Sequence, residues 1–240
     1  MAWGDMSEAQ QMALMGLLGA VLSPAGLENI RTQMAADGVL RVQDSSPGNA
    51  SPGNSAPGNR PPVGPRVKFG ADYYYVSFLG TPSTTSPWML QFGGHHLGIN
   101  ATVVGPNVTL SPTLTGGQPV KFTQSREAIH IAEQEVDQAR ALLNSLTDAQ
   151  REKAVIGTHF IDLVLGPGKD GMTLQPEGLP GTEMTDTQKA RLLALIDARL
   201  SIIMNAGLRA AKMTEVRANL GQTYLPGPAR LSRLPGPIGT

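Results

Sequence analysis

The spacing of apolar residues changes twice along this chain, and this constrains the fold more than any other feature. Before residue 44 and again after residue 128, apolar side chains recur every three or four positions, which is the period of an amphipathic helix. Between Ala71 and Leu114 aromatic and β-branched residues predominate, as in strands. We therefore expect an α+β fold, with an antiparallel β-sheet flanked by amphipathic helices before and after it in sequence.

Helix starts are marked by a repeated polar signature. A hydroxyl residue followed three positions later by Gln forms a capping box, in which each side chain bonds to the backbone N–H of the other residue. The three capping boxes are Ser7–Gln10, Thr147–Gln150 and Thr185–Gln188. Ser23-Pro24 predicts another start, with Pro at the first helical position, and the spacing of Ile129, Val136 and Leu146 predicts a helix in the middle of the chain.

The central block divides into four predicted strands. A hairpin turn at Gly105-Pro106-Asn107 is expected between the last two, and a further short strand is expected later in the chain. The predicted strands are 72–79, 88–92, 95–104, 108–114 and 160–165.

Three copies of Pro-Gly-Asn, at Pro47, Pro52 and Pro57, repeat every five residues within a stretch that contains almost nothing apolar. Each Pro-Gly favours a turn, and such a segment has little to bury. The expected organisation is an N-terminal helical pair at 1–43, a flexible insert at 44–66, a sheet with helices of the same domain at 67–224, and a disordered or aberrant Pro/Gly-rich tail at 225–240.

Composition excludes several kinds of function. The chain has no Cys, which rules out disulfides, zinc–thiolate sites and thiol nucleophiles. Its 19 basic and 19 acidic residues give a net charge of zero, and no basic stripe predicts nucleic-acid binding. The most apolar stretch, Ala13–Leu22, is too short to span a bilayer and lacks the positive start of a signal peptide, so we expect neither membrane insertion nor a signal peptide in this chain.

Two adjacent histidines, His95 and His96, follow a double glycine in the stretch Gln91–Asn100. Imidazole is a neutral metal ligand and the usual acid–base group near pH 7. Neighbours in a strand point to opposite faces, so both rings reach one site only if the glycines distort the strand. Otherwise His95 is a core residue and His96 a surface residue. Both are nevertheless the candidates for catalysis and for metal binding.

The other candidates for binding a ligand are supported by weaker sequence patterns. Gln91 and Asn100 are polar neighbours of the histidine pair, and Tyr73, Tyr75 and Trp88 are aromatic residues around the predicted sheet.

His130 and Glu133 lie one turn apart on the predicted middle helix, a spacing that a solvated helix face produces constantly. His159 precedes a predicted strand. We interpret all three as structural.

Several of these stretches together resemble the bacterial domain-of-unknown-function family catalogued as number 3500, and Gly94-His95-His96-Leu97 is the most specific element. The resemblance implies an exported protein, periplasmic or extracellular, but no activity. The family pattern continues into a His-x-His segment, whereas this chain becomes rich in Pro and Gly after Tyr224, so it is expected to hold only half of a site that joins both histidine motifs. The matching stretches include Asp5–Gln10, Leu22–Gly26, Tyr74–Ser83, Gln91–Leu97, Asn100–Val104, Leu146–Arg151, Ile161–Gly168 and Ala218–Tyr224.

Two functions stay open from the sequence. One is a metal-dependent enzyme, hydrolytic or oxidative, in which His95 and His96 bind a divalent transition metal or exchange protons, with a small molecule as substrate. The other is a non-catalytic exported binding or envelope-associated protein, which uses Tyr73, Tyr75 and Trp88 to hold a small-molecule or glycan ligand. The sequence does not decide the oligomeric state, the substrate or the metal.

Overall fold

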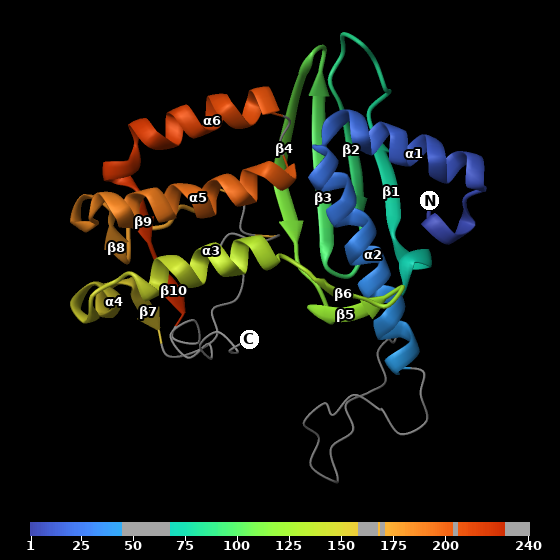
Figure 1. Ribbon diagram of the computed structural model, residues 1–240. Helices are drawn as coiled ribbons and strands as arrows, with labels where there is room; N and C mark the ends of the chain where they lie inside the picture. The colour runs from blue at the N-terminus through green and yellow to red at the C-terminus, as the bar shows by residue number, and fades with distance from the viewer. Residues whose placement is uncertain (45–67, 158–167, 169–170, 204–205, 229–240) are drawn as a thin grey trace, which may run out of the picture. The chain divides into compact units, whose positions relative to one another are not determined.

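The chain forms two compact units in the computed structural model (Figure 1). Unit 1 consists of Met1–Ala132 and Ser201–Ala206, and unit 2 of Glu133–Leu200 and Gly207–Thr240. The helical pair shares a unit with the sheet, whereas most of the later helices belong to the other unit. The structure describes residues 1–44, 68–157, 168, 171–203 and 206–228.

Unit 1 is built on a four-stranded antiparallel sheet whose strands neighbour one another in chain order. Burial alternates along the third strand, as expected for a sheet with one covered face. Val104 pairs with Asn107, which confirms the predicted hairpin turn. The strands are β1 (Tyr75–Leu79), β2 (Trp88–Gly93), β3 (Leu97–Val104) and β4 (Asn107–Thr115).

Two helices cover one face of this sheet, α1 (Glu8–Val21) and α2 (Pro24–Asp44). Figure 1 shows both, in blue, in front of the green strands. Leu18 and Ile30 from the helices and Phe92 from β2 are among the side chains of the unit's main core. Two single-turn helices, η1 (Trp3–Asp5) and η2 (Ala71–Tyr73), precede α1 and β1. The α+β arrangement predicted from the apolar spacing is therefore correct.

The predicted helix starts of unit 1 are also correct. Ser7 and Gln10 form the capping box of α1. The Ser23 hydroxyl accepts a hydrogen bond of 2.9 Å from the Gly26 N–H at the start of α2, which places Pro24 at the first helical position.

The middle helix begins later than predicted. Ile129 and His130 lie in strand β6 (Glu127–His130), which pairs with β5 (Lys121–Gln124). Ile129 pairs with Phe122 there. Its seven-residue spacing to Val136 matches the helical period, but the two residues do not share a helix. The positive φ of Ala132, 56°, separates β6 from α3 (Glu133–Asn144). His130 and Glu133 are therefore not neighbours on a helix.

Unit 2 is mainly helical, with Leu142, Leu179 and Leu192 among the residues of its core. Its capping boxes at Thr147 and Thr185 form as predicted. Its elements after α3 are α4 (Asp148–Ala154), β7 (Val155–Gly157), β8 (Leu179–Pro180), η3 (Gly181–Glu183), α5 (Asp186–Ile203), α6 (Ala206–Ala218), η4 (Leu220–Gln222), β9 (Tyr224–Leu225) and β10 (Gly227–Pro228), with the α5–α6 junction assigned to unit 1.

Order extends into the segment expected to be a disordered tail. Strand β9 pairs with β8, and β10 pairs with β7. Residues 229–240, the predicted strand at 160–165, His159 and all of the Pro-Gly-Asn repeats lie outside the described residues.

Within the described part of the chain, no helix combines the length and the apolar character needed to cross a membrane.

Candidate functional site

The two adjacent histidines form the turn between β2 and β3. Gly93 pairs with Gly98, and the Gly94 N–H donates to the Leu97 carbonyl oxygen at 2.9 Å. The strand predicted from His95 begins instead at Leu97, because the double glycine closes a tight hairpin. The alternation of faces therefore does not apply to the histidines, and their ring centroids lie 3.9 Å apart.

The glycines are required by close packing at the turn. A Cβ on Gly94 would lie 2.6 Å from the ring of Tyr74, and a Cβ on Gly93 would lie 2.5 Å from the carbonyl oxygen of Leu97. Neither position therefore has room for a side chain, and the hairpin packs directly against the Tyr74 ring.

A buried carboxylate orients His95. Its Nδ1 lies 3.3 Å from Oδ1 of Asp37 on α2, and the Asp37 side chain is only 2% exposed whereas that of His95 is 24% exposed. Phe69 packs against the imidazole, with 4.7 Å between ring centroids. A carboxylate accepts hydrogen bonds, so the contact favours the tautomer with hydrogen on Nδ1 and leaves the lone pair on Nε2.

Tyr74 lies behind this pair and is fully buried. Burial raises the pKa of the Tyr74 phenol, and the nearby Asp37 carboxylate raises it further. The hydroxyl forms no hydrogen bond of normal geometry with a described residue. The Asp37 carboxylate is nevertheless close enough to interact with it electrostatically. A buried carboxylate needs donors near it, and His95 and Tyr74 are the groups in that position.

His96 has different partners. Its Nε2 lies 3.3 Å from Oε1 of Gln118. The amide of Gln33, oriented to satisfy its neighbours, donates to the main-chain oxygens of His96 and Gly116 at 3.0 Å each. Gln33 is almost fully buried on α2, so this helix holds the backbone of the turn as well as one of its imidazoles.

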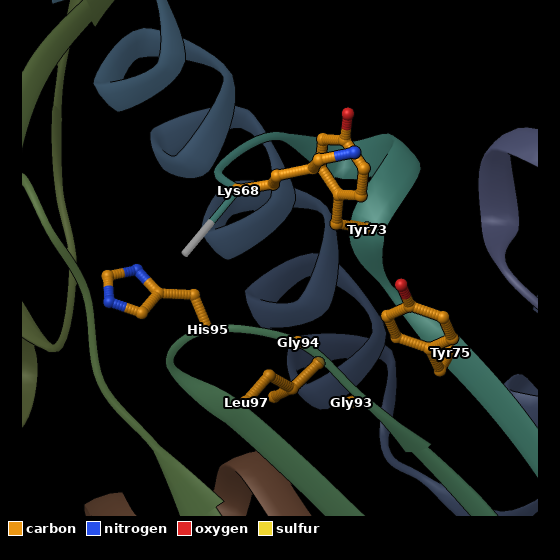
Figure 2. Close-up of a pocket in the computed structure, with 7 residues that line it drawn as sticks. All are labelled: Lys68, Tyr73, Tyr75, Gly93, Gly94, His95 and Leu97. Carbon is orange, nitrogen blue, oxygen red and sulfur yellow. The ribbon is translucent and has the colours of Figure 1, made fainter. Parts of the chain in front are cut away.

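His95 lines an open pocket of about 590 Å³ (Figure 2). Gly93, Gly94 and Leu97 contribute the hairpin, and Tyr73, Tyr75 and Lys68 contribute the opposite wall. Figure 2 shows Lys68 extending toward the Tyr73 ring, with His95 on the other side of the view. The Lys68 ammonium lies 5.4 Å from the centroid of that ring, a cation–π distance.

The other predicted site residues do not line this pocket. Gln91 and Asn100 are cross-strand neighbours. The Gln91 amide donates to Asn100 at 2.8 Å, and Asn100 donates to the Pro112 carbonyl oxygen at 2.9 Å. Trp88 packs on the core, and its indole donates to the Ser83 carbonyl oxygen at 2.9 Å. Of the predicted residues, the pocket brings together only His95, Tyr75 and Tyr73.

Among the described residues, no group of three or more His, Cys, Asp or Glu side chains has the geometry to hold a metal ion. The close pair His95 and His96 therefore has no third His, Cys, Asp or Glu ligand in this part of the chain.

Sequence reasoning missed the contribution of α2. Polar residues recur every fourth position along this helix, and this spacing places them on one face. The first of these residues contacts the second, the second and third contact the β2–β3 turn, and Arg41 forms an ion pair of 2.7 Å with Asp72 of η2. This repeat is visible in the sequence and could have predicted a polar face on α2. Its members are Asn29, Gln33, Asp37 and Arg41.

A family model described as "Protein of unknown function (DUF3500)" matches residues 1–226. No curated protein and no solved structure gives a significant match.

Proposed function

The chain belongs to the DUF3500 family, whose description assigns no activity, and we propose from the site itself that the protein binds a small molecule in the His95 pocket and exchanges a proton with it. His95 is the acid–base group, and Asp37 orients it. One observation carries this proposal: an imidazole that lines an open pocket has one nitrogen against a carboxylate that is 2% exposed. An imidazole held in this way presents its other nitrogen as a base.

The proposal predicts an unusual tautomer. In wild-type protein near neutral pH, neutral His95 carries its hydrogen on Nδ1, because that nitrogen faces Asp37. Two-dimensional ¹⁵N spectra of the imidazoles distinguish this form from the Nε2–H form. Asp37→Asn removes the charge that selects it, and Asp72→Asn is the matched control, because Asp72 directly precedes the pocket residue Tyr73 but pairs with Arg41.

Reactivity is the second readout of this test. We expect diethyl pyrocarbonate to modify His95 about tenfold more slowly in Asp37→Asn than in wild type, in line with the loss on removing a partner that orients an imidazole. Asp72→Asn is expected to react like wild type. The proposal is wrong if His95 carries its hydrogen on Nε2 in wild type, or if both variants react alike.

A second version makes the two imidazoles ligands of a divalent transition metal, supported by the 3.9 Å between their ring centroids. Tight sites need three or four ligands. Metal analysis of tag-free protein separates the versions: stoichiometric Zn, Cu, Fe or Mn that is lost in a His95→Ala/His96→Ala variant supports the metal version. Protein without bound metal that shows the Nδ1–H tautomer supports the acid–base version.

The non-catalytic alternative is supported by Tyr73 and Tyr75 in the pocket wall. It uses the aromatic rings to hold a small-molecule or glycan ligand and gives His95 no chemical role. This alternative would be favoured by a ligand that binds His95→Ala as tightly as wild type and that neither protein converts chemically.

A further inference from the structure

Resting on the proposed function, we infer that the ligand of the His95 pocket is a small organic anion, a carboxylate or a phosphate ester. The first support is the charge of the lining. Among the described residues that line the pocket, Lys68 is cationic, His95 becomes cationic on protonation, and none is acidic.

The acidic groups near this wall are already engaged. Asp72 forms its 2.7 Å ion pair with Arg41, and Asp37 is buried behind His95. None of the ion pairs formed between described residues involves Lys68. The ammonium is held over the Tyr73 ring instead, so its charge is available to an anion that enters the pocket.

The rest of the lining suits the body of an organic acid. The Tyr75 side chain is on the pocket wall and the residue is 55% exposed, so its ring offers an apolar face and its hydroxyl a hydrogen-bond donor. Gly93 and Gly94 line the pocket without side chains, so a flat ligand can approach the backbone there.

The test uses benzoate and its neutral isostere benzamide as probes, with inorganic phosphate as a third arm. Binding is followed in ¹H–¹⁵N spectra by the amide resonances of Gly93 and Gly94. We expect benzoate to bind wild type at least fivefold more tightly than benzamide at low ionic strength, and this preference to shrink in 0.5 M salt because screening weakens charge interactions. Shifts with phosphate alone would point to phosphate esters, and shifts with benzoate alone to carboxylates.

Lys68→Met should abolish the preference for benzoate, whereas Lys121→Met, which removes an exposed lysine from β5 of the same unit, should preserve it. Equal binding of benzoate and benzamide, no binding of any anion, or equal effects of the two lysine variants would overturn the inference. The tautomer of His95 is measured without ligand, so the acid–base proposal stands or falls separately.

Discussion

Asp37 is the residue on which the site depends most. Its buried carboxylate lies near the imidazole of His95 and the phenol of Tyr74. Moving a charge from water into the protein interior is costly unless hydrogen-bond donors or opposite charges stabilise it there. The residue links a core tyrosine to an imidazole that lines a pocket, so a change at any member should affect the others.

The first prediction concerns Tyr74. Its pKa is raised in the folded protein, so the folded state keeps the proton when the unfolded state has lost it. The stability that Tyr74 contributes is therefore fully present below about pH 10 and is lost as the pH rises further, by up to about 1.4 kcal/mol per pH unit. Tyr74→Phe should remove this loss, as measured by urea unfolding between pH 8 and 11.

Tyr75→Phe is the matched control for this prediction, because the neighbouring Tyr75 is 55% exposed. It should retain the alkaline loss of wild type. If both variants show the same dependence on pH, the phenol of Tyr74 is not in the environment described.

At the scale of elements, two capping boxes of unit 2 are joined. Gln150, which caps α4, and Gln188, which caps α5, donate to each other's side-chain oxygens at 3.0 and 2.8 Å. Gln150 also donates to the Glu183 carbonyl oxygen, and Gln188 to that of Ser145. The capping box at Ser7 and Gln10 is exposed and forms no such link to another described side chain. One local motif thus has two structural roles.

We therefore predict different effects of removing the capping glutamine. Gln10→Ala should cost about 0.5–1 kcal/mol, the loss of an exposed cap, whereas Gln150→Ala should cost about 2 kcal/mol, because it also removes two of the hydrogen bonds that the buried amide of Gln188 makes. Chemical denaturation gives both values. A Gln150→Ala/Gln188→Ala double-mutant cycle should give a coupling energy of at least about 0.5 kcal/mol, and additive single effects would contradict the link.

At the scale of the whole molecule, each unit has its own core. Leu18 is fully buried in the core of unit 1, and Leu192 is buried in that of unit 2. Separate cores allow regions of a chain to open with different free energies. The candidate site belongs to unit 1 alone, because every residue that lines its pocket lies there.

The prediction at this scale uses one truncation in each core. Leu18→Ala and Leu192→Ala should each cost about 2–5 kcal/mol. Hydrogen exchange read by mass spectrometry should show faster exchange in β2 and β3 for Leu18→Ala, and in α3 and α5 for Leu192→Ala. Faster exchange of all these elements in both variants would mean that the two cores unfold as one.

Local patterns in the sequence predict the element types and most of their ends. Local physics decides these features: capping boxes, a Pro at the start of α2 and the Gly105-Pro106 turn act within a few residues. The prediction of a helix at Ile129 is wrong for the same reason. Ile129 pairs with Phe122 in another segment, and the local spacing of apolar residues carries no information about such pairing.

The residues that form the site are known only from contacts between distant segments of the folded chain. The Gly-Gly-His-His motif identified His95, but Asp37 lies 58 positions away in sequence, and Tyr74 and Lys68 come from a third segment. Folding brings them together through packing of α2 against the end of the sheet, a long-range event that leaves only a four-residue polar repeat in the sequence. The hairpin that brings the two imidazoles into contact also depends on that third segment, because the space beside Gly94 is filled by the Tyr74 ring.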